Sequence, residues 1–172
     1  MPAQTVTRRN VLLLGAGALL AGTALAYGLW LPDQATAQEA QPVTPIAADE
    51  AYRQAQAGEI ILVDIRTPEE WQQTGVAEGA IGLDMTQDDF VASLVKLREA
   101  NPDTPLALIC RTGNRSGYAT EALAKQGFPG LADVKEGMAG GRNGEGWLNR
   151  GLPTYAGTPA NVHERTRARL GQ

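Results

Sequence analysis

The sequence predicts a single α/β domain built on an open, mainly parallel sheet with helices on both faces. Two observations favour this fold: short apolar runs alternate with segments of helical character, and no internal repeat divides the 172-residue chain. In sheets of this kind ligands bind at the carboxyl ends of the strands. Asp64 and Cys110 both follow apolar runs directly, so the same edge of the sheet is expected to hold both.

Each expected strand is an apolar run of the length and composition that a buried parallel strand needs. The four expected strands are residues 60–63, 80–83, 106–109 and 131–134.

The helices have local signals. Gly58 ends the first, Pro68 starts the second, and Asp88 and Asp89 are expected in the first turn of the third. The four expected helices are residues 47–57, 68–73, 88–99 and 117–126.

The two ends of the chain are expected to lie outside the domain, which spans residues 47–155. The N-terminus carries Thr7-Arg8-Arg9-Asn10-Val11-Leu12, an apolar stretch over 11–31 and a small-x-small site at Ala35-Thr36-Ala37. These features resemble a twin-arginine export signal, and they predict a signal peptide over 1–37 and a periplasmic protein. The alternative is an uncleaved segment that anchors the protein to the inner membrane. Residues 38–46 read as a linker, and 156–172 as a tail with a basic, solvated helical end.

Composition excludes several partners and cofactors. The net charge is −4 and the chain stays acidic after the signal is removed, which argues against nucleic acid and against an anionic membrane surface. One cysteine and one histidine, His163, lie far apart, so no metal site and no cofactor is expected. A single cysteine also excludes an internal disulfide. In an oxidising compartment an unpaired thiol is exposed to damage, so a chain that keeps one is expected to use it.

The segment Cys110-Arg111-Thr112-Gly113-Asn114-Arg115-Ser116 is the best candidate for a catalytic site. Backbone N–H groups at the start of the following helix are expected to point at whatever the sulfur carries. Two guanidinium groups nearby favour a thiolate, which is the nucleophilic form. A cysteine that merely fills a core needs neither the glycine nor the charges.

This loop resembles the active-site loop of the rhodanese family of sulfurtransferases. Val63–Trp71, with Asp64, Arg66 and Glu70, resembles the family's upstream motif, and Gly137–Gly141 with Trp147 and Gly151–Pro153 resembles its closing motif. Two departures stand out. The family's histidine before the third strand is absent from Gly75–Ala80, and Arg142–Gly146 separate the closing glycines from Trp147.

The resemblance implies sulfur transfer through a persulfide on Cys110. Cys110 would take a sulfur from a small anionic donor such as thiosulfate and pass it to a thiol, cyanide or a protein acceptor. The residues expected to hold the donor and the persulfide are Arg111, Thr112, Gly113, Asn114, Arg115 and Ser116.

Supporting roles are expected for three residues upstream. Asp64 would fix the loop, and Arg66 and Glu70, four residues apart, could pair across a turn. Arg111 and Arg115 are candidates for the sulfonate end of the donor, although one of them, Arg115 rather than Arg111, could instead be held in a salt bridge. The mechanism requires a thiol that a donor can reach.

Two other functions are alternatives to a sulfurtransferase enzyme. A persulfide carrier for one protein partner needs the same loop. A cysteine phosphatase needs arginine six positions after its cysteine, where this chain has Ser116, and Arg115 comes one position early.

Overall fold

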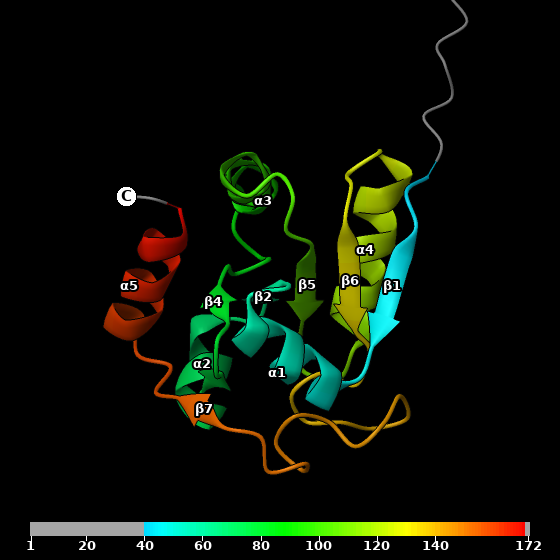
Figure 1. Cartoon of the computed structure of the whole chain (residues 1–172). Coiled ribbons are helices and arrows are strands. Elements are labelled where there is room, and N and C mark those ends of the chain that lie inside the picture. The colour runs from blue at the N-terminus through cyan, green and yellow to red at the C-terminus, as the bar shows by residue number, and fades with distance from the viewer. Residues whose placement is uncertain (1–39, 171–172) are drawn as a thin grey trace, which may run out of the picture. The chain divides into compact units, whose positions relative to one another are not determined.

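The structure, a computed structural model, describes residues 40–170 (Figure 1). The predicted signal peptide over 1–37 and the first two residues of the predicted linker therefore lie outside the described residues. Within residues 40–170 no helix is both long enough and apolar enough to cross a bilayer.

The centre of the fold is a five-stranded sheet in which each neighbouring pair of strands runs parallel, in the order β1-β6-β5-β2-β4. This confirms the predicted open parallel sheet. Its strands are β1 (Val43–Ile46), β2 (Ile61–Asp64), β4 (Ile81–Gly82), β5 (Leu106–Ile109) and β6 (Leu131–Val134). A separate two-stranded antiparallel pair joins β3 (Val76–Ala77) to β7 (Thr154–Tyr155).

Within residues 40–170 five helices accompany the sheet, and local sequence explains where two of them end or begin. Gly58 ends α1 in a left-handed conformation, with φ 73°. Thr67 and Glu70 form a reciprocal capping box at the start of α2, with Pro68 in its first turn. The helices are α1 (Ala48–Ala57), α2 (Pro68–Thr74), α3 (Phe90–Ala100), α4 (Asn114–Lys125) and α5 (Pro159–Arg169).

The core consists of two clusters, one on each face of the sheet, because successive side chains along a strand point to opposite faces. Ala107 and Ile109 of β5 point to the cluster that contains residues of α1 and α2. Leu106, Leu108 and Cys110 point to the cluster that contains residues of α3 and α4. The nucleophile candidate therefore lies on the α4 side of the sheet, just beyond the end of its central strand.

Four differences from the predicted elements stand out. Asp88 and Asp89, expected in the first turn of the third helix, precede α3, which begins at Phe90 with Asp89 as its N-cap. Val43–Ile46, predicted as linker, is an edge strand held by parallel pairing with β6. Residues 159–169, predicted as tail, form α5, which packs on β4 with Val162 buried. Helix α4 starts at Asn114, three residues earlier than predicted, so the last three residues of the CRTGNRS segment belong to its first turn.

Candidate active site

The loop from Cys110 to Gly113 joins β5 to α4 and turns sharply at Gly113. Gly113 has φ 84°, and a Cβ atom there would lie 1.7 Å from the carbonyl oxygen of Lys135. Only glycine allows both this conformation and this approach. The turn brings Ser116 back over Cys110, with 3.4 Å between Ser116 Oγ and Cys110 Sγ.

The backbone N–H groups of this loop are unused. Within residues 40–170, none of the N–H groups from Arg111 to Ser116 donates a hydrogen bond to a protein acceptor, whereas Gly117 N–H donates to Gly113. Free donors at a helix N-terminus form a binding site for an anion. The predicted cradle needs unpaired main-chain donors of this kind, and whether they point at the sulfur stays a prediction.

Cys110 itself is completely buried, with 0% of its surface exposed. It packs in the α3–α4 cluster, whose buried members are aliphatic apart from Phe90 and Cys110 itself. The expectation of a directly reachable thiol is thus wrong for this conformation of the protein. Residues 110–116 alone do not reveal this burial, because the cluster around Cys110 includes residues from segments both before and after it.

The two arginines of the CRTGNRS segment, Arg111 and Arg115, lie in different environments. Arg115 makes a bidentate ion pair with Glu70 of α2, at 2.8 and 2.6 Å. This pair holds the pKa of the Glu70 carboxyl below its ordinary value and raises the pKa of Arg115. Arg111 is exposed and lines a cavity of about 70 Å³ together with Arg66, Glu70 and Met138.

Asp64 and Arg66 form a buried unit beside the loop. Arg66 donates to both carboxylate oxygens of Asp64, with a shortest distance of 2.6 Å, and to the carbonyl oxygen of Gly75 at 2.8 Å. Strand register places Asp64 opposite Ile109, the residue before Cys110. The predicted pairing of Arg66 with the Glu70 carboxylate is wrong, since Arg66 is taken by Asp64 and Glu70 by Arg115.

The segment after β6 closes over the loop. Met138 N–H donates to the carbonyl of Cys110 and Ala139 N–H to that of Arg111, at 2.8 and 2.7 Å. A Cβ atom at Gly137 would lie 2.6 Å from the Thr112 nitrogen, so the backbones touch. Asn143, inside the Arg142–Gly146 insertion, donates to the carbonyl of Thr112 at 3.1 Å.

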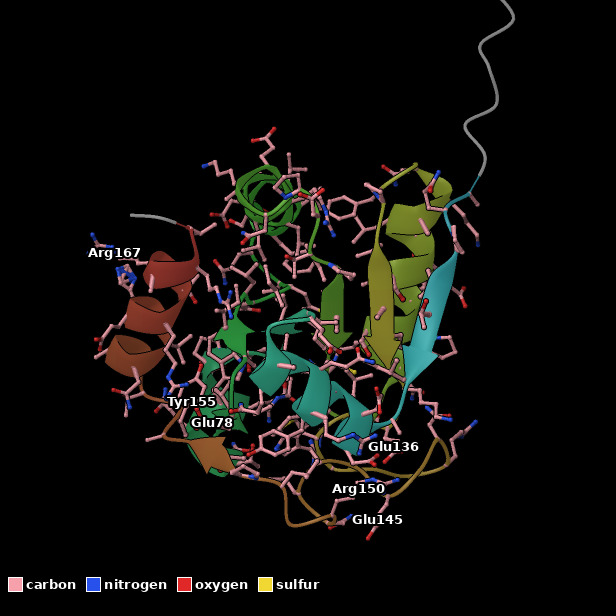
Figure 2. All side chains as sticks on the ribbon, viewed as in Figure 1. Glu78, Glu136, Glu145, Arg150, Tyr155 and Arg167 are labelled. Carbon is pink, nitrogen blue, oxygen red and sulfur yellow. The ribbon has the colours of Figure 1, made fainter. Side chains whose placement is uncertain are left out.

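A buried carboxylate holds this closing segment in place. Glu136 accepts from Gly146 N–H at 2.9 Å and from Arg150 Nε and Nη2 at 2.8 and 2.9 Å. Figure 2 shows Glu136, Arg150 and Glu145 together below α1. Sequence reasoning missed Glu136, Asn143 and Arg150, because no local pattern reveals contacts made across 10 to 31 residues.

Two tryptophans and two further residues of the CRTGNRS segment also have defined positions. Trp71 and Trp147 are buried. Thr112 lies on the loop and Asn114 begins α4, and Asn143 contacts both the Thr112 carbonyl and the Asn114 side chain.

Comparison with known proteins gives the family. The model of the rhodanese-like domain matches residues 47–143, more than half of the chain. A sulfurtransferase of Allochromatium vinosum is 31% identical over 106 residues, which cover 62% of this chain and 88% of that protein.

Solved structures support the same fold. The structure of Rv0390 from M. tuberculosis is 25% identical, with a TM-score of 0.52, and the match covers 66% of this chain and 98% of that one. A thiosulfate sulfurtransferase from Pseudomonas aeruginosa is 21% identical with a TM-score of 0.53, over 74% of this chain and 24% of that one. The chain belongs to the rhodanese-like domain family.

Proposed function

We propose that this protein is a sulfurtransferase that carries a sulfane sulfur as a persulfide on Cys110. The observation that supports it is the position of the single cysteine at the base of a loop whose N–H groups, from Arg111 to Ser116, have no protein acceptor. A persulfide ends in a negatively charged sulfur, and preorganised N–H donors stabilise such a charge. The sulfurtransferase relative of Allochromatium vinosum agrees with this chemistry.

The first half-reaction takes the sulfur from the donor. The Cys110 thiolate attacks the outer sulfur of thiosulfate, a new S–S bond forms, and the old S–S bond breaks with its electron pair leaving on sulfite. In the second half-reaction a thiolate or cyanide attacks the outer sulfur, and Cys110 leaves as a thiolate. No cofactor or metal takes part in either step.

Arg111 is the candidate to bind the sulfonate end of the donor. It is exposed, it lines the cavity beside the loop, and no described acidic side chain pairs with it. Arg115 is already paired with Glu70, so its role is to hold the first turn of α4. Because Cys110 has no exposed surface, the donor reaches Sγ after a local movement of the groups that cover it.

The decisive test is the mass of the intact protein after incubation with thiosulfate. We expect a gain of one sulfur, and we expect Cys110→Ser to gain none while its circular dichroism and unfolding midpoint stay close to the wild type. Sulfur transfer retained by Cys110→Ser would contradict the mechanism.

Burial of Cys110 gives one specific reason to consider a persulfide carrier as the second candidate. A protein partner that binds the loop could open it and expose Cys110, whereas a small molecule in free solution would reach this buried thiol slowly. Mass gain of one sulfur with negligible thiosulfate:cyanide turnover would favour the carrier, and fast turnover the enzyme. Hydrolysis of a phosphate ester, measured on the same sample, would instead indicate a phosphatase.

We also propose that the protein is exported to the periplasm of a bacterium, on the basis of the twin-arginine pattern around Arg8 and Arg9. Fractionation of cells that produce the full chain, with N-terminal sequencing, tests this. A mature protein beginning near Gln38 in the periplasm is expected. Full-length protein in the inner membrane would indicate an anchor instead.

A further inference from the structure

Three consecutive carbonyl groups of the active-site loop, those of residues 110–112, are held by the closing segment after β6. The backbone N–H groups of Met138 and Ala139 donate to the first two, at 2.8 and 2.7 Å. The third bond comes from a side chain, because Asn143 Nδ2 donates to the carbonyl of residue 112 at 3.1 Å. Any residue with a backbone N–H can make the first two bonds, whereas the third depends on the amide of Asn143.

These bonds also determine which way the neighbouring N–H groups point. The peptide bonds of the loop are trans. In a planar trans peptide the carbonyl and the N–H of the following residue point in opposite directions. The N–H groups of Arg111, Thr112 and Gly113 are therefore turned away from the closing segment, and within residues 40–170 none of the three donates to a protein acceptor. Successive N–H groups on one side of a turn, here beside the left-handed Gly113, form a concave site for an anion.

Asn143 reaches the loop from the turn of a short arm formed by residues 140–146. Gly141 and Gly144 form an antiparallel bridge across this arm, with N–H···O distances of 2.9 and 3.2 Å. The buried carboxylate of Glu136 accepts from the last N–H of the arm at 2.9 Å and lies so close to Gly144 that no Cβ atom fits there. Backbone contacts therefore set the position of the arm, and replacing the Asn143 side chain leaves them in place.

The amide of Asn143 contacts the chain on both sides of Gly113. Besides the Thr112 carbonyl, Nδ2 reaches Oδ1 of Asn114 at 3.4 Å. A Cβ atom on Gly113 would lie 3.2 Å from the same nitrogen. One side chain thus fixes the peptide unit between Thr112 and Gly113, whose N–H is the third donor of the concave site. The arm includes Arg142–Gly146, so this contact comes from a segment in which the chain departs from the family pattern.

We propose that Asn143 is a positioning residue for sulfur transfer, which holds the peptide before Gly113 so that Gly113 N–H points at the outer sulfur of a Cys110 persulfide. That sulfur carries negative charge, and a donor whose direction is fixed in advance stabilises the charge without reorganising. Asn143 touches neither the sulfur donor nor the acceptor and acts only through this peptide. The inference deepens the proposed function and rests on it for the identity of the anion, but the direction of the N–H groups can be tested without sulfur.

The test compares alkylation of the single cysteine by iodoacetate and by iodoacetamide, followed by intact mass, at concentrations where the rate is proportional to the reagent. The two reagents differ in the charge of the group that enters the loop, so the ratio of their rates reports the preference for an anion. Opening of the loop and ionisation of the thiol affect both reagents alike and cancel in the ratio. We expect the ratio to be roughly 100-fold higher in the folded wild type than in the same chain unfolded in urea.

Asn143→Ala is expected to lower this ratio about tenfold, because Gly113 N–H loses its fixed direction. Asn149→Ala is the matched control. Asn149 also donates from Nδ2 to two backbone carbonyls, at 3.1 and 2.9 Å, but both belong to the closing segment and neither to the active-site loop. Its ratio should equal that of the wild type.

Steady-state thiosulfate:cyanide kinetics of the same variants test the role in sulfur transfer. Removing one such donor outright costs about 10²–10³ in kcat, so a donor that is only loosened should lower kcat about tenfold in Asn143→Ala. KM for thiosulfate should stay nearly unchanged, because Arg111 is still present to bind the sulfonate. A raised KM with an unchanged kcat would place Asn143 in donor binding and overturn the positioning role.

A folded wild type whose ratio equals that of the unfolded chain overturns the inference, even if no variant folds. An unchanged ratio in Asn143→Ala overturns it as well, and so does an equal fall in Asn149→Ala, which would indicate a general loosening of the closing segment. Alkylation needs no sulfur donor. The expected ratios in a protein that takes no sulfur from thiosulfate would therefore contradict the proposed function and support the positioning of the N–H groups by Asn143.

Discussion

Arg111 and Arg115 have separate tasks although they are only four positions apart in the sequence. Arg115 forms a bidentate ion pair with Glu70, 45 residues earlier in the chain. This pair links α2 to the first turn of α4. Arg111 lines the cavity with its guanidinium exposed. A bidentate pair with a fixed carboxylate orients the loop, whereas an exposed arginine beside a cavity can take an incoming sulfonate.

Arg111→Ala is therefore expected to weaken binding of thiosulfate more than it slows chemistry. We predict a KM for thiosulfate about tenfold higher, equivalent to about 1.4 kcal/mol, with kcat nearly unchanged. Steady-state thiosulfate:cyanide kinetics measure both constants. Arg142→Ala removes another exposed arginine, from the closing segment, and should leave KM as it is. A KM that does not move in Arg111→Ala would remove this residue from donor binding.

At the scale of the elements, the site is a contact between two backbones. The loop after β5 and the segment after β6 touch at Gly113 and Gly137, where no side chain fits, and two hydrogen bonds join them at Cys110 and Arg111. Asn143 adds a third link. The N–H groups of the loop keep their orientation because the opposite edge of the loop is held in this way.

Gly113→Ala is expected to separate these backbones. A Cβ atom there would meet the Lys135 carbonyl oxygen at 1.7 Å, so the loop must shift as well as accept the strain of a left-handed residue. We predict loss of sulfur loading by intact mass, and a larger drop in the urea midpoint than in Gly58→Ala. Gly58 is the matched control, because it has φ 73° and nothing within 4 Å, so only strain of about 1–3 kcal/mol applies. Equal stability losses and normal loading would contradict the close-contact account.

Local sequence patterns predicted the inner strands of the sheet and the alternation of strands and helices along the chain. They did not predict the elements that are stabilised mainly by contacts with distant segments. The apolar runs of β2, β5 and β6 were found within one residue, since a strand buried on both faces has an unmistakable composition. The edge strand β1 contains Pro45 and exposes Thr44, and α5 buries Val162 alone, so neither carries an apolar pattern. The same limit applies to the site: Cys110 was found from its loop, while its burial and its neighbour Asn143 depend on other segments.

On the scale of the whole molecule, ionised carboxylates in several places support the fold. Asp49 on α1, Glu70 on α2 and Glu136 after β6 each pair with arginine, and in each the pairing holds the carboxyl pKa below its ordinary value. A carboxyl with a lowered pKa stabilises the folded state above its unfolded pKa, and this stabilisation is lost as the pH falls through the folded value. Asp133, whose pKa is raised, acts in the opposite sense, so protonating it favours folding.

Glu136 offers the sharpest test of this balance because its side chain is only 3% exposed and it holds the closing segment through Gly146 and Arg150. We predict that Glu136→Gln is less stable than the wild type by about 1–3 kcal/mol near neutral pH, where the wild-type carboxylate is ionised. The difference should shrink as the pH falls below the ordinary glutamate value of 4.5, since the wild type then loses the same charge. Urea unfolding at about pH 7, about pH 5 and about pH 3 measures it, with Glu99→Gln, an exposed glutamate on α3, as the control that should follow the wild type. A stability gap that stays constant down to the lowest pH would show that the Gln side chain disturbs packing, and that the charge of Glu136 is not what holds the closing segment over Cys110.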